Sequence, residues 1–316
     1  MGSSTASLST TPEPTAVGTD RLEILSTELL IQTRPLVEQF RQVSYHLGIG
    51  LGWHYLLDLS WAAQQLAPTP GTRVMDAGAG LGIMQWWLAD QGVDVISVDR
   101  ASRRNLPIRF WQRYRIQGWC EEGLAPPKPS LCDFLPPRSP RCWHLYPQKL
   151  ATSLRQWQRK HEIAPDSGTV FIYNQDLTAM SDIPDNSMDA VVSISALEHN
   201  SPDKLRACVA ELMRVLKPGG KLVATLGATK GQDWFHEPSK GWCYTQGTLG
   251  VIFGLPADYP SNYDQYDELF ETLRDCAELR DNLANFYFKS GDNGMPWGIW
   301  DPKYQPVGVV KTKKHE

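Results

Sequence analysis

Asp76-Ala77-Gly78-Ala79-Gly80-Leu81-Gly82 is the stretch of sequence that decides the fold. It follows a short apolar segment, Val74-Met75, and leads into a helical pattern that extends from Ile83 to Ala89. A second apolar run, Val93 to Val98, ends in Asp99. A strand, a glycine-rich turn, a helix and a strand that ends in an acid together predict a nucleotide-binding βαβ unit.

The spacing of the glycines indicates which nucleotide is bound. A dinucleotide loop reads G-x-G-x-x-G, where the third glycine lets a helix and a strand pack beside a pyrophosphate. The present stretch reads D-x-G-x-G-x-G, and Ile83 stands where the third dinucleotide glycine would fall. This spacing speaks against a nicotinamide dehydrogenase. It resembles the first motif of class I S-adenosylmethionine (SAM)-dependent methyltransferases.

The resemblance implies a role for each residue of this unit. Asp76 would hold the amino-acid end of SAM, directly or through water. Gly78 and Gly80 would let the backbone approach the ligand without a Cβ in the way. Asp99 would accept hydrogen bonds from both ribose hydroxyls, because a carboxylate offers two acceptor oxygens. The predicted cofactor-binding residues here are Asp76, Gly78, Ala79, Gly80, Asp99 and Arg100. The alternative is a glycine turn that binds nothing.

Further motifs of the same family follow in the same order. The apolar run Phe171 to Tyr173 leads to Asp176, which the resemblance places at the adenine amino group, with the Leu177 backbone beside the ring. The next apolar run, Asp189 to Ser195, is followed by Ala196-Leu197-Glu198-His199. The backbone around Ser195 would line the SAM pocket.

A helix and a turn complete this part of the chain. Ser201-Pro202 is a favourable helix start, and Lys217-Pro218-Gly219-Gly220 ends the helix before the apolar strand Lys221 to Leu226. This turn is frequent in class I methyltransferases. The resemblance covers Thr72 to about Thr229, apart from an insertion.

The expected fold is α/β: a Rossmann-like, seven-stranded, mostly parallel sheet with helices on both faces. Residues 1–19 read as a disordered tail because they are rich in Ser, Thr, Ala and Pro. Residues 20–70 read as N-terminal helices that cover the cofactor site, with helical patterns at Leu22–Leu30, Leu36–Leu47 and His54–Leu66. Residues 71–316 are expected to form the methyltransferase domain.

Two residues in the third helical pattern could touch the methionine end of SAM. These are His54 and Tyr55. Tyr55 also lies on the apolar stripe of that pattern, so a place in the core is the competing interpretation.

About seventy residues separate Asp99 from the next strand, where one helix would suffice. We interpret residues 116–165 as an inserted cap or lid beside the active-site face. Cys120, Cys132, Cys142 and His144 lie in it, but their spacing matches no common zinc site, and buried thiols are the better interpretation. No metal site is predicted.

The last part of the chain should supply two strands and the acceptor pocket. Asn285–Phe288 and Val307–Lys311 are the candidate strands, and helical patterns lie in Tyr266–Leu283. Many aromatic residues fall in Gly- and Pro-rich sequence that we expect to form loops and acceptor walls. They are Trp234, Phe235, His236, Trp242, Tyr244, Trp297 and Trp300.

The composition narrows the class of protein and its partners. The 316 residues carry a net charge of −4, which gives no bulk electrostatic case for nucleic acid. The basic stretch Arg100–Arg115 is expected to be a solvated helix face, with a phosphate or acidic-substrate contact as the alternative. No apolar run could span a bilayer, and six scattered cysteines are typical of a reduced, cytoplasmic protein. The sequence leaves the oligomeric state open.

Methyl transfer from a sulfonium needs an aligned nucleophile and, for a hydroxyl acceptor, a base. The candidate catalytic residues are His199 and Glu198 after the fourth strand and His236 after the fifth. We expect a SAM-dependent methyltransferase that acts at oxygen on a small or medium-sized organic acceptor and releases S-adenosylhomocysteine (SAH). The alternatives are an aminopropyl transferase on the same fold and a non-catalytic partner or binding module. A DNA methyltransferase is weaker, because Ser195-Ala196-Leu197-Glu198 stands where an Asn- or Asp-Pro-Pro-Tyr motif would be.

Overall fold

The computed structural model describes residues 20–118, 147, 150, 163–289 and 291–315. The predicted tail and most of the predicted insertion, with its three cysteines and His144, lie outside the described residues.

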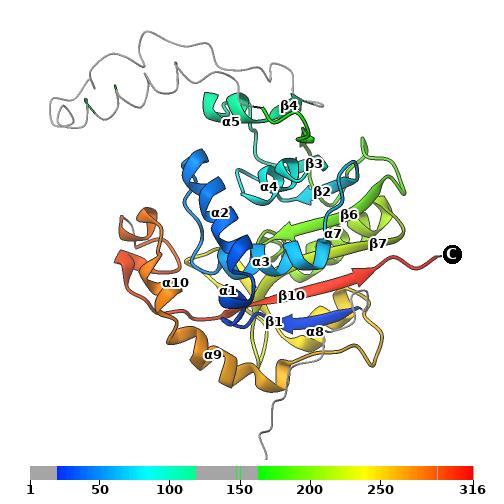
Figure 1. Ribbon diagram of the computed structural model, residues 1–316. Helices are drawn as coiled ribbons and strands as arrows, with labels where there is room; N and C mark the ends of the chain where they lie inside the picture. Colours follow the sequence, from blue (N-terminus) through cyan, green and yellow to red (C-terminus); the bar gives the residue numbers. More distant parts are fainter. Residues whose placement is uncertain (1–19, 119–146, 148–149, 151–162, 290, 316) are drawn as a thin grey trace, which may run out of the picture.

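A mostly parallel sheet forms the centre of the molecule (Figure 1). Six neighbouring strands run parallel, in the spatial order β4 (Arg115–Gly118), β5 (Thr169–Asn174), β3 (Asp94–Asp99), β2 (Arg73–Ala77), β6 (Met188–Ile194) and β7 (Leu216–Ala228). β10 (Gln305–Thr312) and β1 (Arg21–Ile24) extend the sheet beyond β7 in antiparallel fashion. The predicted strand at Val307–Lys311 is therefore confirmed as part of β10.

A short hairpin adds the last two strands. β9 (Gly241–Tyr244) pairs with the end of β7, and β8 (Trp234–His236) pairs with β9. The α/β class is confirmed. The predicted number of seven strands is wrong, because the sheet has ten strands in the described part of the chain.

Two predicted elements have the wrong type. The predicted helix at Leu22–Leu30 begins instead as β1, and only Leu29–Gln32 forms a helical turn, α1. Leu22 and Ile24 are buried against β10, and the Asn262 side chain binds the Ile24 backbone at both its N–H and its C=O. Asn285–Phe288, a predicted strand, is the 3₁₀ helix η5. The edge strand next to β10 is thus β1, from the N-terminal part of the described chain.

Helices cover both faces of the sheet (Figure 1). One face carries α2 (Arg34–Leu47), α3 (Tyr55–Leu66), α4 (Met84–Asp90) and α5 (Ile108–Arg113). The other carries α7 (Pro202–Val215) and α8 (Gln246–Ile252). The predicted helices at Leu36–Leu47 and His54–Leu66 are confirmed, and the pattern at Tyr266–Leu283 forms α9 (Tyr266–Arg274) and α10 (Ala277–Asp281).

The apolar stripe of α3 packs on the sheet as expected. Leu56, Leu59, Ala62 and Ala63 are all buried. Trp61 of this helix and Trp86 of α4 are almost fully buried. Several of the tryptophans therefore fill the core, since burying a large aromatic ring removes much apolar surface from water.

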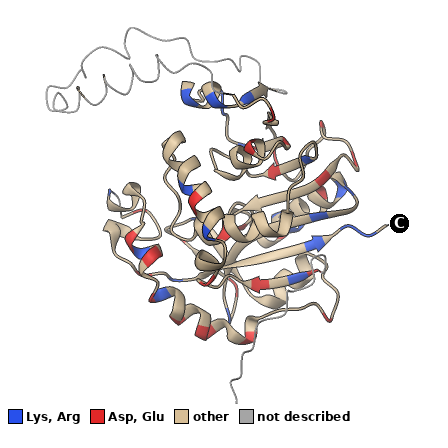
Figure 2. Ribbon diagram, viewed as in Figure 1, with Lys and Arg blue, Asp and Glu red and all other residues tan. Residues whose placement is uncertain are grey.

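The basic stretch is not simply a solvated face. Figure 2 shows its basic segments on α5 and β4. Arg103 is buried and donates to the carbonyls of Ser97 and Tyr173, and Arg113 pairs with Asp90 at 2.8 Å. The expectation of a solvated face is wrong for Arg103. Arg103 therefore fastens the segment between β3 and α5 to the sheet, and Arg113 fastens α5 to α4.

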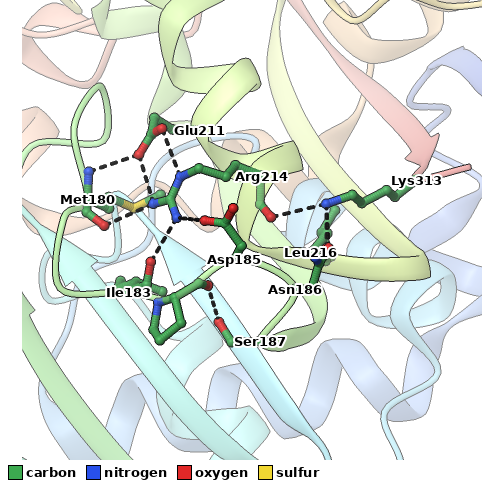
Figure 3. A network of polar contacts seen from close by, with 10 residues as sticks. Met180, Ile183, Asp185, Asn186, Ser187, Glu211, Arg214, Leu216 and Lys313 are labelled. Atoms are coloured by element: carbon green, nitrogen blue, oxygen red, sulfur yellow. Dashed lines mark hydrogen bonds and ion pairs between the residues drawn. The ribbon is translucent and has the colours of Figure 1, made fainter. Parts of the chain in front are cut away.

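Arg214 of α7 fastens the loop between β5 and β6, as Figure 3 shows. Its guanidinium donates to the carbonyls of Met180 and Ile183, each at 2.9 Å, and pairs with Glu211 and Asp185. The loop that follows Asp176 is therefore anchored to α7 through Met180 and Ile183.

In the described parts of the chain, no helix combines the length and the apolar character needed to cross a membrane.

Candidate functional site

A cavity of about 440 Å³ opens at the carboxyl ends of β2, β3 and β6. This edge is where open α/β sheets bind ligands, and the volume lies in the range of small-molecule sites. All the residues that the sequence predicted to contact SAM line this cavity, except His54. They are Tyr55, Asp76, Gly78, Ala79, Gly80, Asp99, Arg100, Asp176, Leu177 and Ser195.

Gly78 shows why the loop needs glycine. Its φ of +75° is in the left-handed region, which disfavours residues with a side chain. A Cβ on Gly78 would lie 2.5 Å from the Cβ of Ala196, which follows β6. The loop after β2 and the end of β6 therefore touch at this point, and both line the cavity.

The two acids of this βαβ unit have different environments. Asp76 is 3% exposed, and burial raises the pKa of its carboxyl to about 7, although Arg103 opposes the rise. Asp99 lies at the end of β3 and accepts hydrogen bonds from the backbone N–H groups of Gly80 at 2.8 Å and Ala101 at 2.6 Å. A carboxylate oxygen can accept more than one hydrogen bond, so Asp99 retains acceptor capacity toward a ligand.

Asp176 also lines the cavity and follows β5, the neighbour of β3 in the sheet. Its Oδ1 accepts hydrogen bonds from the N–H and the hydroxyl of Thr178, which lower the pKa of this exposed carboxyl. The cavity thus combines a buried acid whose pKa is near neutrality, Asp76, with the half-buried Asp99 and the exposed Asp176.

A second cavity, of about 300 Å³, adjoins the first. Gly50, Tyr55, Ser195 and His199 line both cavities. Aromatic rings form much of the wall of the second cavity. They are Trp53, His54, Tyr55, Phe286, Tyr287 and Tyr304.

A buried polar cluster lies at the boundary between the two cavities. Nδ1 of His54 lies 2.6 Å from Oδ2 of Asp58, and the Ser195 hydroxyl donates to the same oxygen at 3.0 Å. Asp58 is fully buried on α3. Ser195 has a φ of +45°, a conformation that costs energy for any residue with a side chain.

Sequence reasoning missed Asp58. An acid within an apolar helical stripe, four residues after a histidine, was the available signal, because residues i and i+4 share one face of a helix. His54 was predicted near SAM, and the structure places it in the wall of the second cavity.

The predicted catalytic residues lie in three different environments. Glu198 and His199, in the 3₁₀ helix η3 (Leu197–His199), line the second cavity. Glu198 is buried, its Oε2 has no hydrogen-bond partner among the described residues, and burial raises the pKa of its carboxyl. His199 is exposed, and its Nδ1 lies 2.8 Å from the Lys240 carbonyl.

His236 lies in β8, and its Nδ1 is 2.7 Å from the Ser239 hydroxyl. It is buried, and burial lowers the pKa of its imidazole. His236 itself lines neither of the two cavities. Its hydrogen-bond partner Ser239 lines the second cavity. It contacts the ring of Tyr304 edge-on at 5.4 Å between centroids.

Five of the predicted aromatic loop residues belong to strands instead. Trp234, Phe235 and His236 form β8, and Trp242 and Tyr244 lie in β9. These segments became strands because β9 pairs with the end of β7, a contact that no local pattern reveals.

Comparison with known proteins adds a family match over part of the chain. Residues 142–224 match the family model for a methyltransferase domain. The match includes Asp176, Ser195, Glu198 and His199, and it leaves out the glycine loop at 76–82. The resemblance to SAM-dependent methyltransferases is confirmed over this segment. No curated protein matches the chain.

Solved structures show a distant likeness over most of the chain. The [4+2]-cyclase SpnF is 14% identical, with a TM-score of 0.46, over 94% of this chain and 99% of its own. A putative sarcosine dimethylglycine methyltransferase from Galdieria sulphuraria is 15% identical, with a TM-score of 0.42, over 83% and 86%. The 1,6-didemethyltoxoflavin-N1-methyltransferase of Burkholderia thailandensis is 15% identical, with a TM-score of 0.41, over 89% and 90%.

Proposed function

We propose that this protein is a SAM-dependent methyltransferase that acts at oxygen on a small or medium-sized organic acceptor. The observation that carries the proposal is the first cavity, where the motif residues of four separate segments meet. The methyltransferase family match over residues 142–224 supports it.

The residues present fit SAM. Because Gly78 carries no side chain, its backbone can lie against Ala196 at the cavity wall and could approach a ligand closely. Asp99 would accept hydrogen bonds from the ribose hydroxyls, and Asp176 with Leu177 would lie at the adenine. The Asp76 carboxylate would attract the ammonium group of the methionine end, and this charge would favour its ionised form. When bound, SAM supplies an activated methyl group.

The second cavity would receive the acceptor, because it adjoins the first at Tyr55, Ser195 and His199. Glu198 and His199 would contact the acceptor, and a hydroxyl acceptor would lose its proton to a group there. The direct catalytic role predicted for His236 remains a prediction, and its place behind Ser239 and Tyr304 favours support of the cavity wall.

Calorimetric titration of the full chain with SAH tests the proposal. We expect binding of SAH and SAM and stabilisation against heat by both, since a ligand that binds only the folded state stabilises it. NAD and decarboxylated SAM serve as comparison ligands for the dehydrogenase and the aminopropyl transferase. Failure of both SAM and SAH to bind would contradict the proposal.

A further inference from the structure

His54 and Asp58 form the most enclosed acid-base pair beside the second cavity. His54 is 4% exposed and Asp58 is fully buried, and their side chains are 2.6 Å apart at Nδ1 and Oδ2. The pair lies at the start of α3, where His54 is the N-cap residue. Both side chains are therefore held by a helix that packs on β6, β7 and β10.

The hydrogen bond determines which nitrogen of His54 can accept a proton. An ionised carboxylate only accepts hydrogen bonds, so Nδ1 carries the proton and Nε2 keeps its lone pair. Nε2 makes no hydrogen bond within the described part of the chain, and His54 lines the second cavity. Asp58 would also stabilise the imidazolium that forms when Nε2 takes up a proton.

The surroundings of the pair select the kind of acceptor. The ring of His54 contacts the rings of Trp53, Tyr55 and Tyr304, with centroids 4.6 to 5.7 Å away. Phe286 and Tyr287 add further apolar wall. A flat aromatic ring fits such a wall through stacked and edge-on contacts.

Other ionisable groups in the cavity are less suited to act as the base. Burial raises the pKa of Glu198, which favours its neutral, hydrogen-bond-donating form. His199 is exposed, and its Nδ1 faces a neutral carbonyl instead of a carboxylate. Asp292 also lines the cavity but is exposed to solvent, unlike His54, and the remaining ionisable groups are Tyr55, Tyr287 and Tyr304. Burial raises the pKa of each of the three tyrosines.

We infer that the second cavity binds a phenolic acceptor and that His54, positioned by Asp58, is the catalytic base that removes its hydroxyl proton. The inference rests on the proposed methyl transfer. The phenolic oxygen forms a bond to the methyl carbon, and its proton passes to Nε2 of His54. The carbon–sulfur bond breaks, and its electron pair stays on sulfur. The proton then leaves His54 for solvent, so atoms and charge balance.

The first test requires no turnover. The full chain, labelled with ¹⁵N at histidine and saturated with SAH, is titrated with phenol. His54→Gln assigns the signals of His54. We expect the proton of the neutral His54 ring to lie on Nδ1, and the Nε2 signal to shift as phenol binds. A neutral ring with its proton on Nε2, or an Nε2 signal that phenol does not move, would overturn the inference.

The second test separates proton removal from positioning of the acceptor. Phenol and thiophenol have the same ring, but thiophenol is largely ionised at neutral pH and needs no base. We expect His54→Gln to lower kcat for phenol by about 10²- to 10⁴-fold and kcat for thiophenol by less than about tenfold. Asp58→Asn should lower kcat for phenol more than for thiophenol as well. His46→Gln, which alters an exposed histidine of α2, should change neither rate.

The outcomes distinguish the inference from the proposed function. Equal losses with both acceptors would show that His54 only shapes the cavity, and transfer from the wild type to neither probe would exclude the phenolic acceptor. SAH titrations of each variant monitor folding and the first cavity. Loss of SAH binding in the wild type itself would contradict the proposed function instead.

Discussion

The backbone N–H of Gly80 donates a 2.8 Å hydrogen bond to Oδ2 of Asp99. The bond joins the glycine loop after β2 to the acid at the end of β3. Because Gly80 has a φ of +45°, the loop turns its N–H toward the neighbouring strand in a conformation that glycine adopts at little cost. The carboxylate proposed to bind the ribose is therefore oriented by the loop that forms the cavity wall.

Asp99→Asn should weaken SAH binding by about 10- to 100-fold, the effect of losing a hydrogen bond to a charged group. In the wild type, the N–H groups of Gly80 and Ala101 each donate to a different oxygen of Asp99. The amide of asparagine has one oxygen and one N–H donor in their place, so it offers fewer acceptor sites to the ribose. Calorimetry with SAH measures the effect.

Asp94→Asn is the matched control, since Asp94 begins the same strand and accepts from the Thr169 N–H. It should change the affinity by no more than about twofold. An Asp99→Asn protein that binds SAH like the wild type would show that the ribose lies elsewhere.

Gly78→Ala should destabilise the fold and abolish SAH binding. The left-handed φ costs about 1 kcal/mol for alanine, and the contact with the Ala196 Cβ adds about 1 to 3 kcal/mol of overpacking. Thermal unfolding and SAH titration measure the two effects.

Gly71→Ala is the control that measures the cost of the left-handed backbone conformation without a steric contact. Gly71 has a φ of +79°, but apart from its two chain neighbours no described residue has an atom within 4 Å of the site that a Cβ would take. This variant should lose only about 1 kcal/mol and keep full SAH affinity. Equal destabilisation of the two variants would mean that the loop does not touch Ala196.

Asp76 should make the free protein less stable as the pH rises. Its pKa is raised from 3.8 to about 7 in the folded state, so the unfolded chain releases this proton first. The loss in the free energy of unfolding due to Asp76 is absent below about pH 4 and grows between the two pKa values. It reaches about 4 kcal/mol above pH 7, at about 1.4 kcal/mol per pKa unit. Asp76→Asn should therefore be more stable than the wild type at pH 8 and equal to it near pH 4.

Denaturant unfolding at both pH values measures this difference. Asp203→Asn, at an exposed position of α7, should show no pH-dependent gain. A destabilised Asp76→Asn protein at pH 8 would indicate that the carboxylate is needed in its charged form even without a ligand.

Arg214→Met should lower the free energy of unfolding by about 1 to 3 kcal/mol, because the carbonyls of Met180 and Ile183 lose a charged donor. Chemical denaturation measures the loss. Arg206→Met on the same helix removes an exposed pair 3.6 Å apart and should cost at most about 0.5 kcal/mol. Similar losses in both variants would show that the network of Figure 3 does not anchor the loop.

Local patterns predicted the cavity because its residues follow strands that are themselves buried and apolar. Val74-Met75 and Val93–Val98 form β2 and β3 as expected, and their carboxyl ends bring Asp76 and Asp99 together. The predicted cofactor residues therefore meet at one edge of the sheet.

The features that the sequence did not predict depend on contacts between residues far apart in the chain. Leu22 and Ile24 are in a strand because β10, from the other end of the chain, lies beside them. Asp58 finds its hydroxyl partner in Ser195, 137 residues away. The spacing of His54 and Asp58 indicates a shared helix face, but it gives no sign of the contact with Ser195, which emerged only from the structure.

A crystal structure of the full chain with SAH tests the central claim most directly. We predict that SAH lies in the first cavity, with its ribose hydroxyls at Asp99 and its adenine beside Asp176 and Leu177. An empty first cavity at saturating SAH, or SAH bound at another place, would contradict the account.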